Sequence, residues 1–303
     1  MNVFETMAST QMLMFLYLAT GMVLSKMGII TKEGRAGMLS LLICVVMPCS
    51  ILNPYLEGLT MEMMKQGIAA MAVSFCGCLL SRYLGAFLWR KMPEGRREVL
   101  TYGTMLPNFG NAGLPVTQLV FGQQGVFITS MQMIPSTIIG WTVGPAIYHK
   151  KADNIEGIIR VLKNPNIVAV LLGIVILLTK MPVPSVICRA VTGFSGMTAP
   201  LSMVLIGAAL SEVPVKEVAK KEVLLFCGVR LLIIPLTVLA ALKLLHASQL
   251  LCQVSMVLFA MPVANYVAIQ AELYGGDHRF ASALVFLTTL LSLVTVPLLT
   301  LLL

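Results

Sequence analysis

The residues best suited to bind a solute lie in one short run, Leu106–Pro115. It places Pro107, Asn108, Gly110 and Asn111 near the middle of a long stretch without charged side chains. Proline removes a backbone donor from a helix and glycine adds backbone freedom, so the run predicts an interrupted helix. Inside a membrane, unwound backbone is tolerated only within protein or beside a water-filled cavity. We interpret the run as a binding site; the alternative is a packed kink whose asparagines bridge helices.

A second run carries the same residue types later in the chain. It holds Pro262, Asn265 and Gln270 in another long apolar stretch. Alone, this run is typical of an ordinary proline kink. If both helices break at mid-membrane and cross, the N-termini of their second halves meet there. Each such end carries about half a positive charge and free N–H groups, which favours an anion and above all a carboxylate.

The composition indicates that most of the chain lies in lipid. Hydrophobic residues make up 58% of the 303 residues and charged residues 11%, against about 45–50% and about 25% in soluble domains. This excludes an ordinary soluble enzyme and a disordered chain. Metalloprotease, nucleotide-loop and serine-hydrolase motifs are absent from the sequence, so we expect neither an enzyme nor an ATP-driven pump, and no bound cofactor.

Ten apolar segments predict an all-α membrane protein with ten transmembrane helices. The uncharged stretch from Val99 to Tyr148 is too long for one helix, and Phe121–Gly125 is its only plausible turn, so it contributes segments four and five. The other predicted segments are 6–25, 36–56, 66–89, 164–179, 190–211, 223–242, 247–271 and 280–303. No segment has the sustained period-two alternation of a membrane barrel.

Ten segments divide into two sets of five, and an odd number makes the second set inverted relative to the first. Residues 1–148 form the first predicted repeat, 149–163 a short cytoplasmic linker and 164–303 the second repeat. Paired, interrupted helices in inverted repeats mark the binding sites of secondary transporters. We therefore include Ser50 and Ser202 among the candidate binding residues, because they follow the matching prolines Pro48 and Pro200. Four matched pairs are separated by 152 to 155 positions: Pro48 and Pro200, Pro107 and Pro262, Asn111 and Asn265, Gly122 and Gly276.

The basic residues predict the orientation. Of 21 Lys and Arg residues, fifteen lie in loops after odd-numbered segments and four in the other loops. Cytoplasmic loops are enriched in these residues, so we expect odd-numbered loops in the cytoplasm and both termini outside the plasma (inner) membrane. This asymmetry explains the net charge of +8 without nucleic-acid binding. Arg82 and Arg230 lie within apolar segments, and we expect their side chains to reach the cytoplasmic interface; the alternative is a site that attracts an anion.

The run from Pro107 to Pro115, the Pro262-x-x-Asn265 segment and the Pro48 helix resemble the auxin efflux carrier family. This family includes the plant PIN-FORMED carriers and bacterial permeases for malate or malonate. The resemblance covers essentially the whole chain, and its most specific part is the pattern Asn-x-Gly-Asn-x-Gly-x-Pro that begins at Asn108.

The resemblance implies ten helices in two inverted repeats, a fold similar to that of the bile acid–sodium symporters, and transport of organic anions. Helices four and nine would cross at their prolines, with Pro107, Asn108, Asn111 and Pro262 at the crossover and Asn265 one turn beyond. The central loop of about fifteen residues is too short for the regulatory region of the plant carriers, so the bacterial permeases are the more similar branch.

We therefore predict a carrier for a small organic anion that works by alternating access. A receptor for the same ligand and a passive channel are the alternatives. Because Asp, Glu and His are absent from the segments except at their ends, a proton-coupled carboxylate at mid-membrane is disfavoured. We favour uniport driven by the substrate gradient and the membrane potential. Sodium held near Asn108 and Gln270, proton coupling through a boundary residue, and a homodimer remain open.

The predicted orientation can be tested with single cysteine reporters in a cysteine-free protein. A reporter at Gln123 should react with an impermeant thiol reagent from outside, and one at Lys151 only from inside, as the distribution of basic residues requires. Reaction of both reporters from one side would contradict the inverted repeat.

Overall fold

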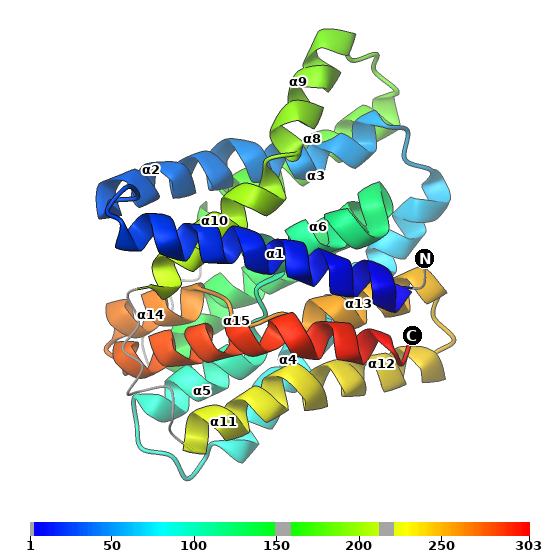
Figure 1. Cartoon of the computed structure of the whole chain (residues 1–303). Coiled ribbons are helices and arrows are strands. Elements are labelled where there is room, and N and C mark those ends of the chain that lie inside the picture. Colours follow the sequence, from blue (N-terminus) through cyan, green and yellow to red (C-terminus); the bar gives the residue numbers. More distant parts are fainter. Residues whose placement is uncertain (1–2, 149–158, 212–220) are drawn as a thin grey trace.

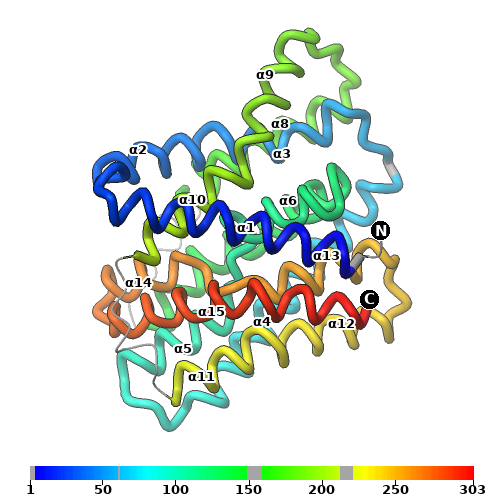
Figure 2. Tube along the Cα trace, in the orientation of Figure 1, coloured from blue at the N-terminus to red at the C-terminus, as the bar shows by residue number. Residues whose placement is uncertain are grey.

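The computed structural model describes residues 3–148, 159–211 and 221–303, and every regular element in these ranges is a helix. Most of the helices lie side by side along one common direction, α9 is steeply inclined to them, and both termini lie at the same end (Figures 1 and 2). The first half contains α1 (Val3–Lys26), α2 (Lys32–Leu41), η1 (Leu42–Val46), α3 (Met47–Leu56), α4 (Met61–Leu88), α5 (Arg96–Met105), η2 (Phe109–Gly113) and α6 (Leu114–Ile147). The second half contains α8 (Pro165–Thr179), α9 (Ser185–Ser195), α10 (Thr198–Leu210), α11 (Lys221–Gly228), η4 (Val229–Ile233), α12 (Ile234–Leu244), α13 (Gln249–Phe259), α14 (Tyr266–Tyr274) and α15 (His278–Thr300).

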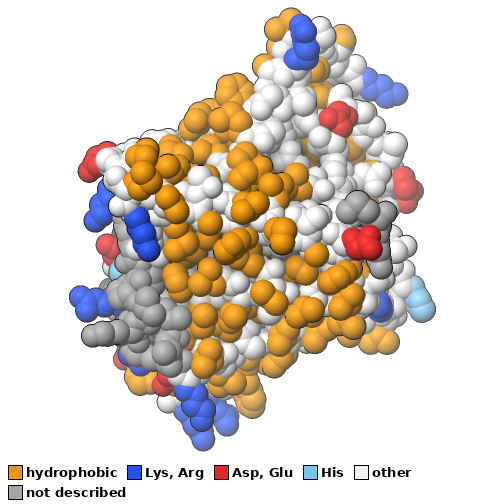
Figure 3. Space-filling view, in the orientation of Figure 1, with side chains coloured by type: hydrophobic (Ala, Val, Ile, Leu, Met, Phe, Trp, Pro, Cys, Tyr) orange, Lys and Arg blue, Asp and Glu red, His pale blue; other side chains and the backbone are white. Residues whose placement is uncertain are grey.

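The described helices form a multi-pass membrane bundle. Seven helical segments are long and apolar enough to cross a membrane, and the shorter helices α8 and α13 are also apolar. On the face shown in Figure 3, hydrophobic side chains cover the middle of the bundle and charged side chains gather toward its ends. A bundle that exposes so much apolar surface needs lipid around it. The predicted all-α membrane fold is confirmed at this level.

Helix α6 is two antiparallel helices joined at Gly122. Its 34 residues would extend about 50 Å as one straight helix, well beyond the roughly 30 Å of a hydrocarbon core. Gly122 has φ 59° and ψ −149°, a combination that is strained for any residue with a Cβ. The hydroxyls of Thr117 and Thr129, on either side of this glycine, lie 2.8 Å apart. The chain therefore reverses in the predicted turn at Phe121–Gly125.

Three helices contain a wide π turn that the sequence did not predict. Each turn ends two residues before a proline: η1 before Pro48, η2 before Pro115 and η4 before Pro235. Proline has no N–H and clashes with the preceding turn, so the helix loses a bond there and widens. A π turn also rotates every later side chain about the helix axis, which changes the face that each residue presents.

Two helix pairs hold the half of the bundle drawn uppermost in Figure 1. Helix α1 packs along α10, and α8 packs along α3. At the first contact the backbones touch, because a Cβ on Gly21 would lie 2.0 Å from the carbonyl oxygen of Val204 and one on Gly207 would lie 2.0 Å from that of Leu18. Small residues allow this close approach of membrane helices. At the second contact the ring of Tyr55 lies against Gly173.

Substitution of Gly207 by alanine should destabilise the bundle, because the new methyl group would overlap backbone that cannot move aside. Overpacking typically costs about 1–3 kcal/mol, and thermal unfolding in detergent should detect it as a lower melting temperature. Gly193→Ala is the matched control, since a Cβ on this helical glycine has nothing within 4 Å. The control should melt at or above the parent temperature, because alanine favours a helix by about 1 kcal/mol over glycine. Equal melting temperatures for the two variants would contradict the contact.

Candidate functional site

Two broken helices cross near the centre of the bundle. Helix α5 ends at Met105 and η2 begins at Phe109, while α13 ends at Phe259 and α14 begins at Tyr266. The extended segments between them form an antiparallel bridge at Pro107 and Val263. The N–H of Asn108 donates to the carbonyl of Pro262 at 2.8 Å, and the N–H of Ala264 donates to the carbonyl of Leu106 at 3.2 Å. Each broken helix thus supplies hydrogen-bond partners that the other needs.

The side chain of Asn108 caps the second half of the first broken helix. Its Oδ1 accepts a hydrogen bond from the N–H of Asn111 at 3.1 Å, which is the bond of a helix N-cap. The amide NH₂ of Asn108 has no acceptor in the described part of the chain and stays available to a ligand. Asn265 occupies the N-cap position of α14, although its side chain makes no cap hydrogen bond. Two half-helix N-termini, each with partial positive charge, therefore meet at the crossover.

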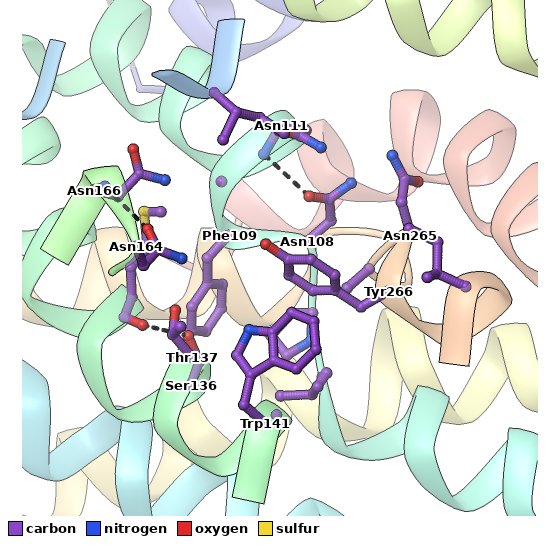
Figure 4. A pocket seen from close by; sticks show the side chains of 18 of the residues that line it. Asn108, Phe109, Asn111, Ser136, Thr137, Trp141, Asn164, Asn166, Asn265 and Tyr266 are labelled. Atoms are coloured by element: carbon purple, nitrogen blue, oxygen red, sulfur yellow. Dashed lines mark hydrogen bonds between the residues drawn. The ribbon is translucent and has the colours of Figure 1, made fainter. Parts of the chain in front are cut away.

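Two adjoining cavities open onto these N-termini. The smaller, about 120 Å³, is lined by Pro107, Asn108, Gly110 and Asn111 together with residues of α2, α6, α8 and α14. The larger, about 700 Å³, lies among α2, α10, α14 and α15. Four residues line both cavities: Leu39, Asn111, Asn265 and Ile269. Figure 4 shows Asn108, Asn111 and Asn265 grouped beside the crossing segments.

The larger cavity connects the crossover with basic residues at one end of the bundle. Lys32, Arg35 and Arg279 line it, as does His278. His278 Nδ1 lies 3.2 Å from the carbonyl oxygen of Ala268. Among the described residues, no Asp or Glu lines either cavity. A passage with cationic groups and without carboxylates attracts anions and repels cations.

Six of the nine predicted site residues line the two cavities, and the other three, Pro262, Gln270 and Ser50, do not. Ser202 lines the larger cavity, although its hydroxyl donates to the Thr198 carbonyl in its own helix at 2.6 Å. Pro262 contributes its backbone carbonyl to the crossover. Gln270 is buried, with Nε2 3.5 Å from the carbonyl oxygen of Gly140, and does not line the two cavities. Ser50 is buried beside Gln118 of α6, 3.4 Å away, and also lies outside them.

Several lining residues were not predicted from the sequence. Asn164 and Asn166 flank Pro165 at the start of α8, where the Asn164 side chain accepts from the N–H of Asn166 at 2.9 Å. Trp141 and Tyr266 meet edge to face in the smaller cavity, with ring centroids 5.8 Å apart. The Asn-Pro-Asn pattern was a usable signal, because it repeats the residue types of the crossover. The aromatic pair gave none, since an apolar stripe on a membrane helix usually faces lipid or core.

The expectation that Arg230 extends to the interface is wrong. Its side chain is 0% exposed, and Nη2 donates to the carbonyl of Met261 at 3.3 Å. Arg82 is half-buried, with its guanidinium 5.3 Å from the ring centroid of Tyr83. Arg230 lies within the π turn η4, away from the ends of its helix, and finds its acceptor on the unwound segment of the crossover.

A membrane bundle with two broken helices that cross beside a cavity lined by asparagine side chains is typical of transport proteins. A family model described as "Membrane transport protein" matches residues 3–300. The chain therefore belongs to this family, and the resemblance to the auxin efflux carriers is confirmed.

Two archaeal proteins are similar along nearly their whole length. An uncharacterized transporter of Methanothermobacter thermautotrophicus is 27% identical over 303 residues, which cover 97% of this chain and 96% of that protein. The uncharacterized transporter MJ1031 of Methanocaldococcus jannaschii is 25% identical over 290 residues, which cover 90% and 92%. Both similarities extend across the two broken helices, so the transporter assignment concerns the whole bundle.

Two substitutions of Asn108 should distinguish its role as a helix cap from its role as a hydrogen-bond donor to the ligand. Asn108→Ser keeps a capping oxygen and removes the amide NH₂, whereas Asn108→Ala removes both. Loss of a buried donor to a carboxylate typically costs about 1–3 kcal/mol, or roughly 5- to 150-fold in affinity, so both variants should bind carboxylates more weakly. Only Asn108→Ala should also lose about 1 kcal/mol of stability with its cap. Melting temperatures with and without added carboxylates measure both effects, and parent-like binding by both variants would exclude Asn108 from the site.

Proposed function

We propose that the protein is a carrier for a small organic anion, with a carboxylate as the group that the crossover binds. The observation that carries the proposal is the set of charged and hydrogen-bonding groups in the cavities. Two helix N-termini and three amide side chains lie at the crossover, and basic residues line the approach to it. No carboxylate is among the described lining residues. Helix N-termini favour anions because their N–H groups are free and their dipoles point positive. Apolar side chains such as Leu39 and Ile269 complete the lining, which suits the carbon body of the acid.

For the architecture we propose ten membrane crossings in two inverted halves, 1–148 and 164–303, joined by the linker 149–163. The ten predicted segments all coincide with helical structure in the described residues, and the reversal at Gly122 splits α6 into two crossings. The pairing of α1 with α10 and of α3 with α8 supports the repeat, because exchanging the two halves converts one pair into the other. Gly275, with φ 82°, turns the chain after α14 as Gly122 does after the first broken helix.

Alternating access follows from this arrangement if one group of helices rocks against the other around the crossover. The larger cavity joins the basic end of the bundle to Asn111 and Asn265, which corresponds to an inward-facing carrier when basic loops lie in the cytoplasm. We place the protein in the plasma (inner) membrane with both termini outside. Uniport driven by the substrate gradient and the membrane potential remains the favoured coupling, since an exported anion gains about 2.3 kcal/mol per charge per 100 mV. The alternative is proton coupling through a boundary residue such as Glu57 or Glu272.

Counterflow in proteoliposomes tests the carrier against the two alternatives. The purified protein is first screened against mono- and dicarboxylates by thermal shift, since a ligand that binds the folded state raises its stability. The best acid, radiolabelled outside, should then enter liposomes faster when unlabelled acid is present inside. Flux without this acceleration would indicate a channel, and binding without flux would indicate a receptor.

Replacement of a basic residue at the cavity entrance should slow uptake in a salt-dependent manner. Arg279→Gln should lower the rate of carboxylate uptake roughly two- to tenfold at low ionic strength, because focused positive charge raises the local concentration of anions. The deficit should shrink between about 0.01 M and about 0.15 M salt, where the screening length falls from about 30 Å to about 8 Å. Arg189→Gln is the matched control, since Arg189 is exposed and lines neither cavity. An equal loss in both variants would contradict steering through this entrance.

A further inference from the structure

Arg230 is the largest fully buried side chain of the described chain, and it lies in the middle of an apolar helix. Its guanidinium makes one hydrogen bond, from Nη2 to the carbonyl oxygen of Met261 at 3.3 Å. The remaining donors at Nε and Nη1 have no hydrogen-bond partner among the described residues. Met261 lies in the unwound segment between α13 and α14, next to Pro262 of the crossover. The arginine therefore contacts the carrier's broken helix and lines neither cavity.

No carboxylate of the described chain neutralises this cation. Among the described residues, Arg230 forms no ion pair, and its only hydrogen bond goes to a backbone carbonyl. A lone charge in a low-dielectric interior is strongly unfavourable unless it is paired or bound by oriented dipoles. Charged residues inside membranes are for this reason rare and functional. Groups near Arg230 must therefore supply the negative potential that a carboxylate would otherwise provide.

The end of helix α13 supplies that negative potential. The last carbonyls of a helix have no intrahelical partners, and the C-terminus carries about half a negative charge. Helix α13 ends at Phe259, and Met261 follows with a carbonyl that accepts the arginine. In transporters with broken helices, unwound carbonyls and half-helix C-terminal ends are the groups that coordinate a coupling Na⁺. A guanidinium bound to one of them supplies the same charge permanently.

We propose that Arg230 is a resident cation of the crossover: it holds the carbonyl end of the second broken helix in the role that a coupling sodium ion has in other carriers. Arg230 is thus a positioning residue, since it acts on the binding site through the backbone of Met261. This assignment deepens the anion-carrier proposal, and only the statement that the crossover belongs to a carrier rests on that proposal. The contact between Arg230 and Met261 does not depend on it. It removes the need for sodium near Asn108 and Gln270.

The test compares the substrate-free protein in sodium chloride and in N-methyl-D-glucamine chloride at equal ionic strength. The parent should have the same melting temperature in both salts. Arg230→Met, which keeps apolar bulk and removes the charge, should melt lower in N-methyl-D-glucamine and recover part of the loss in sodium, because the small cation can reach the vacated carbonyls. Arg230→Lys should resemble the parent in both salts. Arg82→Met is the matched control, since it makes the same change at a half-buried arginine, and it should show no sodium response.

Hydrogen–deuterium exchange gives a second readout that general destabilisation would not reproduce. Peptides that cover residues 259–266 should exchange faster in Arg230→Met than in Arg230→Lys, while peptides of α1 and α10 should exchange equally in both. Sodium-dependent stabilisation of the parent would overturn the proposal, as would identical behaviour of the Met and Lys variants. If Arg230→Met does not fold, the parent in the two salts and the Lys variant still decide the question. None of these measurements uses a substrate, so their failure is distinct from a failure to find carboxylate transport.

Discussion

The structure depends on one constraint: backbone polar groups that leave a helix inside a membrane must find partners within the protein. Two prolines break two helices, and each break would leave carbonyl and N–H groups unpaired in hydrocarbon. Crossing solves the problem because the N–H of Asn108 reaches Pro262 while the N–H of Ala264 reaches Leu106. Neither helix can be broken alone without loss of these partners. The crossover is therefore a single structural unit built from residues about 155 positions apart in the sequence.

The charges of the crossover follow from the same breaks. Each broken helix contributes one positive end and one negative end, since every half-helix has its own dipole. The positive ends at Asn108 and Asn265 line the cavities, where the proposed anionic substrate would supply the negative charge. The negative end near Met261 contacts Arg230, which lines neither cavity. In the proposed carrier the two charges thus have different sources: the substrate brings the anion, and Arg230 of the chain itself is the cation.

The sequence predicted those features that depend on local chemistry. Proline and glycine act on their own backbone, so the breaks at Pro107 and Pro262 and the reversal near Gly122 could be located. Which face of a helix turns inward depends on packing and, here, on π turns. For this reason Arg230 was expected at the interface, and Ser50 was expected in the site although its partner is Gln118. The basic residues at the cavity entrance were interpreted only as signals of orientation, because a loop charge looks the same in sequence whether or not a cavity opens beside it.

The bridge between the crossing segments is also the shortest ladder that a β-type pairing allows. In a regular antiparallel ladder, Asn108 and Pro262 would exchange two bonds, as would Leu106 and Ala264. Pro262 has no N–H to return, so the Asn108 carbonyl accepts from Gly113 instead. The Leu106 N–H donates to Tyr102 of its own helix. Each pair therefore keeps one hydrogen bond between the two segments, while the Asn108 carbonyl and the Leu106 N–H bond within their own helices. A joint with one bond on each side cannot lengthen into a sheet, and it offers the two helices a pivot at which they can change angle without breaking a row of bonds.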